Sequence, residues 1–287
     1  MQEGEETAAA ARRPQGHELF ATGVTVAYEG VDVVHDASMT LRPGEVTVLV
    51  GPNGSGKSTL LRTLARLQRP RSAELVIDGD TDGLALSPRD FSRHVALLTQ
   101  ARPTPGGLTV RDVVEFGRYP YRGRWGRSDP DGRAAVDRAL AMTGVAELGE
   151  RGAEHLSGGQ LQRVWLASCL AQETGVLLLD EPTTYLDLRY QVELLDLMRD
   201  LADDHGIAVG AVLHDLDQAA AIADRIFLLD KGRVIAHGGP EDVLTPQRLT
   251  DTYGIRIEVE NDPLTGRLRT RAIGRHHSRS ERLSTTS

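Results

Sequence analysis

The chain has 287 residues, of which 40% are hydrophobic and 26% charged, and its formal net charge is −8. This length allows one large domain with a buried core, while the negative charge gives no overall indication of nucleic-acid binding. The single cysteine, Cys169, excludes an intramolecular disulfide, and no apolar run reaches the roughly 18 residues that cross a bilayer.

The two ends of the chain have the composition of tails. Residues 1–18 are acidic and lack the apolar core of a secretory signal, so we expect a disordered N-terminal tail. Residues 256–287 are predicted to form a C-terminal extension that ends in a disordered basic tail, with six arginines from Arg267 onward. A basic tail can contact lipid headgroups or nucleic acid, but a solvated terminus is the preferred interpretation.

Two kinds of strand pattern occur along the chain. Residues 19–43 alternate apolar and polar side chains, which predicts antiparallel strands with one buried face. Continuous apolar runs at 46–50, 176–180 and 207–213 are typical of parallel strands that are buried on both faces. A helical pattern follows each run, and this alternation predicts an α/β fold with a mostly parallel sheet and an antiparallel β subdomain.

Residues 101–172 have a different character. The stretches VRDVVEFGRY and GRAAVDRALAMTGV have helical patterns and flank a loop rich in Gly, Arg and Pro. We therefore expect an α-helical subdomain inserted in the α/β core. Short strands after Ile226 are predicted to complete a domain that spans residues 19–255.

The stretch GPNGSGKST follows the first continuous apolar run and fits the pattern G-x-x-x-x-G-K-[ST], with a strand before it and a helix after it. Backbone N–H groups of such a loop can surround phosphates, Lys57 can reach the β- and γ-phosphates, and the Ser58 hydroxyl can ligate Mg²⁺. The sequence therefore predicts a P-loop site for a nucleoside triphosphate, made of Gly51, Pro52, Asn53, Gly54, Ser55, Gly56, Lys57, Ser58 and Thr59.

Polar residues at the ends of other strands extend this site. The run VLLLDEP delivers Asp180 to the carboxyl edge of the sheet, where it can hold magnesium, and Glu181 can polarise an attacking water. Gln100 and His214 end two further strand-like runs. Either residue alone could simply cap a strand, but together with Lys57 these side chains predict a ring around a γ-phosphate and its water.

Tyr28 precedes the first continuous apolar strand. Its ring offers an aromatic face for adenine, although a half-buried strand tyrosine is the alternative.

The stretch HLSGGQLQR contains a second glycine pair, followed by a helical pattern of about 12 residues, or roughly 18 Å. We expect its Ser157–Gly158–Gly159 end to lie away from the P-loop of the same chain and to meet the phosphate of a second copy. A head-to-tail dimer with two composite sites would provide this arrangement. The alternative is that the glycines only begin a helix, but it does not explain why Ser157 and Gln160 occur beside them.

From about Leu19 to Tyr253, the chain resembles the ATP-binding cassette (ABC) ATPases in the order and spacing of its motifs. These motifs are the P-loop, Gln100, LSGGQ, VLLLDEP, Asp187 in TTYLD, and His214. The resemblance implies a dimer that sandwiches ATP and Mg²⁺ between its subunits. The implied ligands of magnesium are Ser58, Gln100 and Asp180. The resemblance also implies that Tyr28 stacks on adenine and that Gln100 senses the γ-phosphate and couples the ATPase to a membrane partner. Glu181 would be the general base, and His214 would hold the γ-phosphate and the water. Asp187 would contact the other subunit of the dimer, and the residues that act in trans would be Ser157, Gly158, Gly159 and Gln160.

Three further stretches, GRYPY, AQETGVLLLDEPTTYLD and VLHDLDQA, resemble the ATPase subunits of ferric siderophore importers and, more broadly, of haem and cobalamin importers. This resemblance implies a peripheral ATPase at the cytoplasmic face of the membrane, which pairs with integral-membrane permease subunits and works indirectly with a substrate-binding lipoprotein. No nucleic-acid partner is expected. The alternatives are a soluble, non-transport ABC ATPase and the ATPase subunit of an exporter.

The segment from Arg111 to Arg127 is rich in arginine and aromatic residues in a chain that has few aromatics. Exposed Arg, Tyr and Trp are enriched among interface anchors. We therefore predict that this segment docks a cytoplasmic helix of the permease, with the anchors Arg118, Tyr119, Tyr121, Arg122, Arg124, Trp125 and Arg127; a solvated helix and loop is the alternative.

Overall fold

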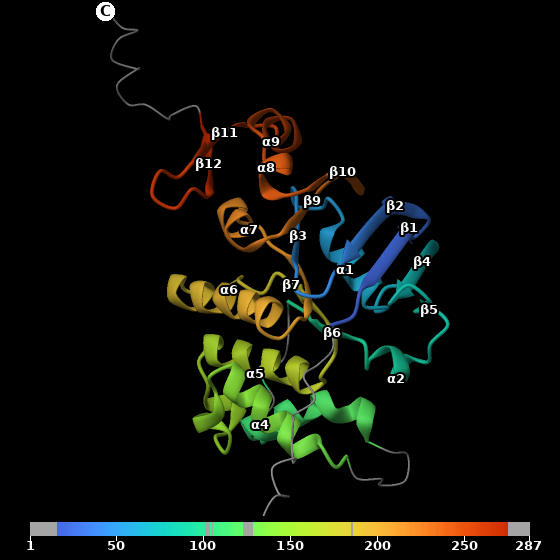
Figure 1. The fold of residues 1–287 in the computed structure, drawn as a ribbon, viewed down its shortest axis with the longest axis vertical. Helices are drawn as coiled ribbons and strands as arrows, with labels where there is room; N and C mark the ends of the chain where they lie inside the picture. The colour runs from blue at the N-terminus through green and yellow to red at the C-terminus, as the bar shows by residue number, and fades with distance from the viewer. Residues whose placement is uncertain (1–15, 101–103, 105, 123–128, 185, 275–287) are drawn as a thin grey trace, which may run out of the picture.

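The computed structural model describes residues 16–100, 104, 106–122, 129–184 and 186–274 (Figure 1). Its central element is a six-stranded sheet with the order β10-β9-β3-β8-β7-β6. Five of these strands are parallel, and β10 pairs antiparallel with β9. The strands are β3 (Val46–Val50), β6 (Val95–Leu98), β7 (Val176–Asp180), β8 (Ala208–Val212), β9 (Arg225–Asp230) and β10 (Arg233–Gly238).

Both faces of the central sheet are covered, which explains the continuous apolar runs. Every residue of β3, β7 and β8 is buried. One core contains Val48 together with side chains of α6 (Leu188–Asp203) and α7 (Leu216–Ile222). The opposite core contains Leu49 together with side chains of α1 (Lys57–Leu64). The predicted α/β fold with a mostly parallel sheet is therefore confirmed.

The N-terminal part forms the predicted antiparallel subdomain, a four-stranded sheet with the order β2-β1-β4-β5. Leu19 pairs with Leu41, and Tyr28 pairs with Val31 next to the turn. Of the predicted tail 1–18, residues 1–15 lie outside the described residues, whereas the Glu18 amide donates to Asp78. The elements are β1 (Leu19–Tyr28), β2 (Val31–Leu41), β4 (Ser72–Ile77), β5 (Thr81–Asp82) and the short helix α2 (Pro88–Phe91).

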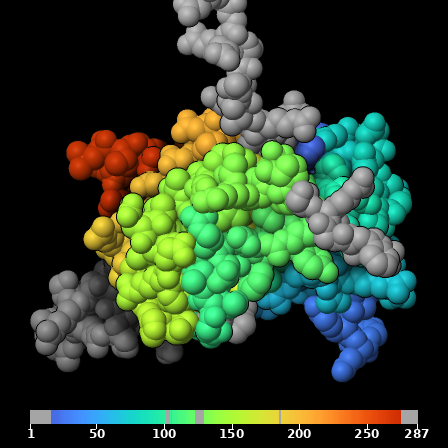
Figure 2. Space-filling view, turned by 90° about the horizontal axis from the view of Figure 1, so that it is seen from below, coloured from blue at the N-terminus to red at the C-terminus, as the bar shows by residue number. Residues whose placement is uncertain are grey.

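The predicted helical insertion packs below the sheet in Figure 1 and faces the viewer in Figure 2. The Thr109 hydroxyl and the Asp112 carboxylate begin its first helix with a reciprocal capping box. The helices are α3 (Val110–Glu115), the 3₁₀ helix η1 (Phe116–Tyr121), α4 (Gly132–Met142), the 3₁₀ turns η2 (Ala146–Leu148) and η3 (Ala153–His155), and α5 (Gly158–Ala171).

The C-terminal part differs from the expected tail. After α8 (Pro240–Val243) and α9 (Pro246–Tyr253), an antiparallel hairpin forms from β11 (Arg256–Asn261) and β12 (Leu268–Ile273). The Thr270 amide and hydroxyl both donate to Asp217 in α7, at 2.7 and 2.8 Å. The first part of the predicted basic tail is therefore a docked strand, and residues 275–287 lie outside the described residues. Within the described ranges, no helix combines the length and apolar character that a membrane span requires.

Candidate active site

The P-loop connects β3 to α1 at the carboxyl edge of the sheet. Gly56 has φ 97° at the N-cap of α1, a left-handed conformation that favours glycine. A Cβ atom on Gly51, whose φ is 144°, would lie 2.1 Å from the Leu229 carbonyl oxygen of β9. The loop therefore depends on glycine where it turns sharply and where it passes close to a neighbouring strand. The buried Ser55 hydroxyl has no hydrogen-bond partner within the described residues.

Lys57 is buried and folds back onto its own loop. Its Nζ donates to the carbonyl oxygens of Gly51 and Pro52, at 2.8 and 2.9 Å. Burial lowers the pKa of the Lys57 ammonium below its ordinary value, and the nearby Glu181 and Asp180 carboxylates oppose this shift. A phosphate anion entering the loop would add a further opposing charge and favour the charged lysine.

Asp180 ends β7 and is buried, as the apolar run predicts. Arg62 of α1 donates to its Oδ2 from Nε at 2.9 Å and from Nη2 at 2.7 Å. Its Oδ1 is buried without a hydrogen-bond partner in the part of the chain that the structure describes. An unpaired carboxylate oxygen fits the oxygen ligands that Mg²⁺ prefers. The sequence analysis did not single out Arg62, although it follows Ser58 by four residues on one helix face.

Glu181 brings the two predicted strand-end residues together. Gln100 Nε2 donates to its Oε2 at 2.6 Å, and His214 Nε2 lies 2.8 Å from its Oε1. Glu181 has φ 53°, an unusual conformation for a residue with a Cβ atom and one that clusters at functional sites. The structure therefore places Gln100, Glu181 and His214 in one cluster, and Asp180 and Glu181 both lie close enough to Lys57 to influence its charge.

The second glycine pair has a local role that the sequence analysis missed. The Gln160 amide donates to the Ser157 Oγ at 3.3 Å, and the Ser157 amide donates to the Gln160 Oε1 at 3.0 Å. These bonds form a capping box at the start of α5. The expectation that a helix start alone does not explain Ser157 and Gln160 is therefore wrong, because both residues cap the helix. The spacing S-x-x-Q is the sequence signal that could have predicted this capping box.

The same surface continues onto the start of α6. Asp187 is the N-cap of α6, where its Oδ1 accepts a hydrogen bond from the Tyr190 amide at 3.1 Å. A Cβ atom on Gly159 would lie 2.9 Å from the Tyr190 ring, so Gly159 allows the two helix starts to pack closely. A Cβ atom on Gly158 would meet nothing within 4 Å. The Gly158 side of the helix start is therefore the side open to a ligand.

Comparison with known proteins identifies the family. Residues 34–184 match the ABC transporter family. The chain is 39% identical over 246 residues to the ferric enterobactin transport ATP-binding protein FepC of Escherichia coli (strain K12), which covers 85% of this chain and 89% of that protein. This chain belongs to the ABC transporter family.

A second relative of this ABC ATPase is the iron(3+)-hydroxamate import ATP-binding protein FhuC of Bacillus subtilis (strain 168), with 41% identity over 235 residues that cover 82% of this chain and 87% of that protein. Among solved structures, an ABC transporter described as metal-chelate type and inward-facing has a TM-score of 0.78 and 25% identity, and covers 91% of this chain and 99% of that chain. These comparisons confirm the sequence-based assignment to ATP-binding, ATP-hydrolysing ABC subunits.

Two tyrosines differ in how they relate to the nucleotide loop of the ABC ATPase. Tyr28 is exposed at the end of β1, and its hydroxyl donates to the Gln68 Oε1 at 3.0 Å. The ring is therefore held at its hydroxyl end while remaining open to solvent, which leaves adenine stacking as a prediction. Tyr253, at the end of α9, lies beside the Gly51 backbone, and burial raises the pKa of its hydroxyl to about 12.

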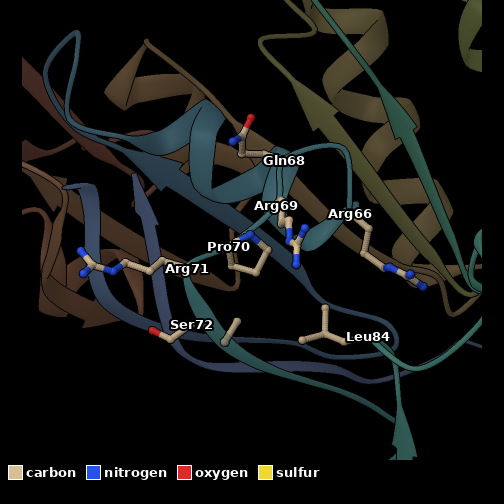
Figure 3. Close-up of a pocket in the computed structure, with 8 residues that line it drawn as sticks. Arg66, Gln68, Arg69, Pro70, Arg71, Ser72 and Leu84 are labelled. Carbon is tan, nitrogen blue, oxygen red and sulfur yellow. The ribbon is translucent and has the colours of Figure 1, made fainter. Parts of the chain in front are cut away.

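A separate cavity of about 480 Å³ lies between the end of α1 and β4 and has Gln68 among its lining residues (Figure 3). Arginine side chains surround it, but Arg66 is occupied by the carbonyl oxygens of Gly83 and Leu86, and Arg71 pairs with Asp32 at 3.4 Å. The cavity contains none of the predicted nucleotide-site residues. It is therefore distinct from the candidate active site.

Proposed function

We propose that this chain is the energy-coupling ATPase of an importer for ferric siderophores, peripheral at the cytoplasmic face of the membrane beneath separate permease subunits. The cluster in which Gln100 and His214 hold the Glu181 carboxylate beside Lys57 carries the proposed hydrolysis. The similarity to FepC and FhuC, whose names state ferric enterobactin transport and iron(3+)-hydroxamate import, supports the substrate class.

In the proposed reaction, the P-loop amides and Lys57 would bind the ATP phosphates. Ser58, Gln100 and the Asp180 Oδ1, which has no hydrogen-bond partner among the described residues, would hold Mg²⁺. Magnesium would neutralise charge that develops on the phosphate oxygens. Glu181 takes a proton from the attacking water as the water oxygen bonds to the γ-phosphorus, and the bond from that phosphorus to the bridging oxygen breaks, with ADP as the leaving group. His214 positions both the Glu181 carboxylate and the γ-phosphate.

We further propose that two copies assemble head to tail, so that Ser157, Gly158, Gly159 and Gln160 of each copy face the nucleotide of the other, with Asp187 beside them. The open space at Gly158 and the free N-terminal end of α5 support this arrangement. The capping box does not oppose it, because the Ser157 hydroxyl can donate to a phosphate while its oxygen accepts from the Gln160 amide.

The structure changes the set of residues that we propose to contact the permease. Arg118 is only 3% exposed, so the prediction that it is an exposed anchor is wrong. Tyr121 is half-buried, and its hydroxyl donates to the Gln172 carbonyl oxygen. Arg122 is exposed and pairs with Glu115, and its role as an anchor stays a prediction. Tyr119 is 78% exposed and Phe116 is 50% exposed on the same 3₁₀ helix. We propose that Phe116 and Tyr119 form the docking surface, on the subdomain that faces the viewer in Figure 2. The predicted anchors Arg124, Trp125 and Arg127 lie outside the described residues.

Uptake of radioactive iron supplied as a siderophore complex tests the substrate class. Cells that lack this gene should lose most uptake, the wild-type gene should restore it, and Lys57→Ala should not, because it removes the phosphate-binding ammonium. Normal uptake of iron chelates by cells that lack the gene would exclude siderophore import.

Co-purification of the permease with the tagged chain tests the docking surface. The double variant Phe116→Ala/Tyr119→Ala should lose most of the permease and retain ATP hydrolysis by the isolated chain. Ile255→Ala is the matched control, because Ile255 is 49% exposed but lies between α9 and β11, away from the helical subdomain (Figure 1). Undiminished co-purification of the double variant would exclude this surface.

A further inference from the structure

The buried guanidinium of Arg118 joins the docking segment to the end of α5. Its Nε and Nη2 donate to both carboxylate oxygens of Asp129, at 2.7 and 3.0 Å. Its Nη1 donates to the Ala171 carbonyl oxygen and to the Glu173 Oε2, both at 2.8 Å. Burial opposes the charge, but the hydrogen bonds and charges of Asp129 and Glu173 outweigh it and raise the pKa of Arg118. The cation is therefore held permanently and from three directions.

Other contacts reinforce this connection at the same place. The Arg118 guanidinium lies over the Tyr121 ring, 4.0 Å from its centroid, and the Tyr121 hydroxyl donates to the Gln172 carbonyl oxygen at 2.9 Å. A Cβ atom on Gly117 would lie 1.9 Å from the Ser168 carbonyl oxygen. The backbone of η1 therefore lies directly against the last turn of α5, with no space between them.

The connection also reaches the strand that leads to the active site. Gln172, just after α5, donates from its Nε2 to the Val95 carbonyl oxygen at 3.2 Å, at the beginning of β6. Strand β6 runs toward Gln100, which contacts Glu181. Arg89 Nε of α2 also donates to the Pro120 carbonyl oxygen, at 2.8 Å. The 3₁₀ helix η1 is thus attached to α5 directly and to β6 through Gln172, while Phe116 and Tyr119 are exposed.

We propose that Arg118 is a positioning residue that makes η1 and the C-terminal end of α5 one rigid unit, so that a shift of Gln100 and β6 on ATP binding reaches the permease. This inference rests on the proposed docking surface. A planar guanidinium that binds a carboxylate with two parallel hydrogen bonds fixes direction as well as distance. A lysine keeps the charge but not this geometry, and the coupling should weaken even where the fold persists.

The experiment uses the complex of the full chain with its permease and measures iron-chelate uptake per ATP hydrolysed. Arg118→Lys should keep the complex and the ATP hydrolysis of the isolated chain, while uptake per ATP falls roughly tenfold. Tyr121→Phe, which removes only the bond to Gln172, should cause a smaller fall in the same ratio. Arg256→Lys is the matched control, because Arg256 of β11 makes an exposed ion pair with Glu258 at 2.9 Å, outside the docking segment, and its ratio should equal that of the wild type.

Hydrogen exchange on the isolated chain provides a second measurement that needs no permease. Amides of η1 and of the last turn of α5 should exchange roughly tenfold faster in Arg118→Lys, while those of α6 should not change. If Arg118→Lys does not fold, Tyr121→Phe tests the coupling role instead, by uptake per ATP hydrolysed and by hydrogen exchange of η1 and the last turn of α5.

The possible failures are distinguishable. A wild-type uptake ratio in Arg118→Lys with an intact complex would overturn the coupling role and leave the docking surface standing. A parallel loss of basal hydrolysis, uptake and thermal stability would also overturn it, because that pattern indicates a merely structural arginine. An unaffected complex in Phe116→Ala/Tyr119→Ala would instead overturn the docking proposal itself.

Discussion

The substitution Glu181→Gln separates the chemical role of this carboxylate from its structural role. Its two oxygens lie 2.6 Å from Gln100 Nε2 and 2.8 Å from His214 Nε2. A glutamine amide has the same shape, and its oxygen can still accept from Gln100 while its NH₂ group donates to a neutral His214. The left-handed backbone at residue 181 is equally strained for both side chains. We therefore expect the free energy of unfolding to change by less than about 1 kcal/mol.

The amide nevertheless cannot accept a proton from water. A general base contributes about 10²–10⁴-fold to a rate, which corresponds to about 2.7–5.5 kcal/mol of activation free energy. Phosphate release by Glu181→Gln should fall by that factor, whereas ATP binding measured by titration should persist, and ATP should produce a stable dimer on size-exclusion chromatography.

The control for this prediction is Glu74→Gln, the same chemical change at an exposed position of β4. It should hydrolyse ATP at the wild-type rate. Near-normal hydrolysis by Glu181→Gln would refute the general-base assignment.

Three other predictions concern the contact between two copies, the packing of η1 against α5, and the charge of Lys57. Ser157→Arg should still bind ATP at its own P-loop but should not dimerise, and mixing it with Lys57→Ala should restore one composite site at most; loss of ATP binding by the monomer would contradict action in trans. Gly117→Ala should lower the free energy of unfolding by about 1–3 kcal/mol, measured with denaturant, because its Cβ would press on the Ser168 carbonyl oxygen. Gly158→Ala, with open space at its Cβ, is the control, and an equal loss there would contradict the packing argument. Burial lowers the pKa of Lys57 in the free protein below its ordinary value, and bound phosphates favour its charged form, so ATP binding should take up a proton at alkaline pH, near the pKa of the free lysine. Affinity should therefore fall as pH rises through the pKa of free Lys57, and calorimetry in buffers of different ionisation enthalpy that shows no proton uptake would contradict this.

Local patterns in the sequence were sufficient for the elements that build the nucleotide loop. The continuous apolar runs predicted β3, β7 and β8 because a strand buried on both faces has no polar side of its own. The sequence was also sufficient to predict the P-loop, because the phosphate contacts come from consecutive backbone amides whose geometry depends on nearby glycines. The meeting of Gln100, Glu181 and His214 followed from one rule, that parallel strands end at the same edge of a sheet.

Only the tertiary structure decided which charged side chains are buried and which face outward. The sequence analysis placed Arg118 on the surface, because arginine is exposed in most proteins, but Asp129 and Glu173, which lie 11 and 55 residues away, satisfy it inside the fold. Distant partners also satisfy the buried Asp180, which accepts from Arg62 across 118 residues, and they attach β12 to α7, where Thr270 donates to Asp217 across 53. A charge can be buried only where distant segments supply its partners, and no local period or motif spacing records which segments the fold brings together.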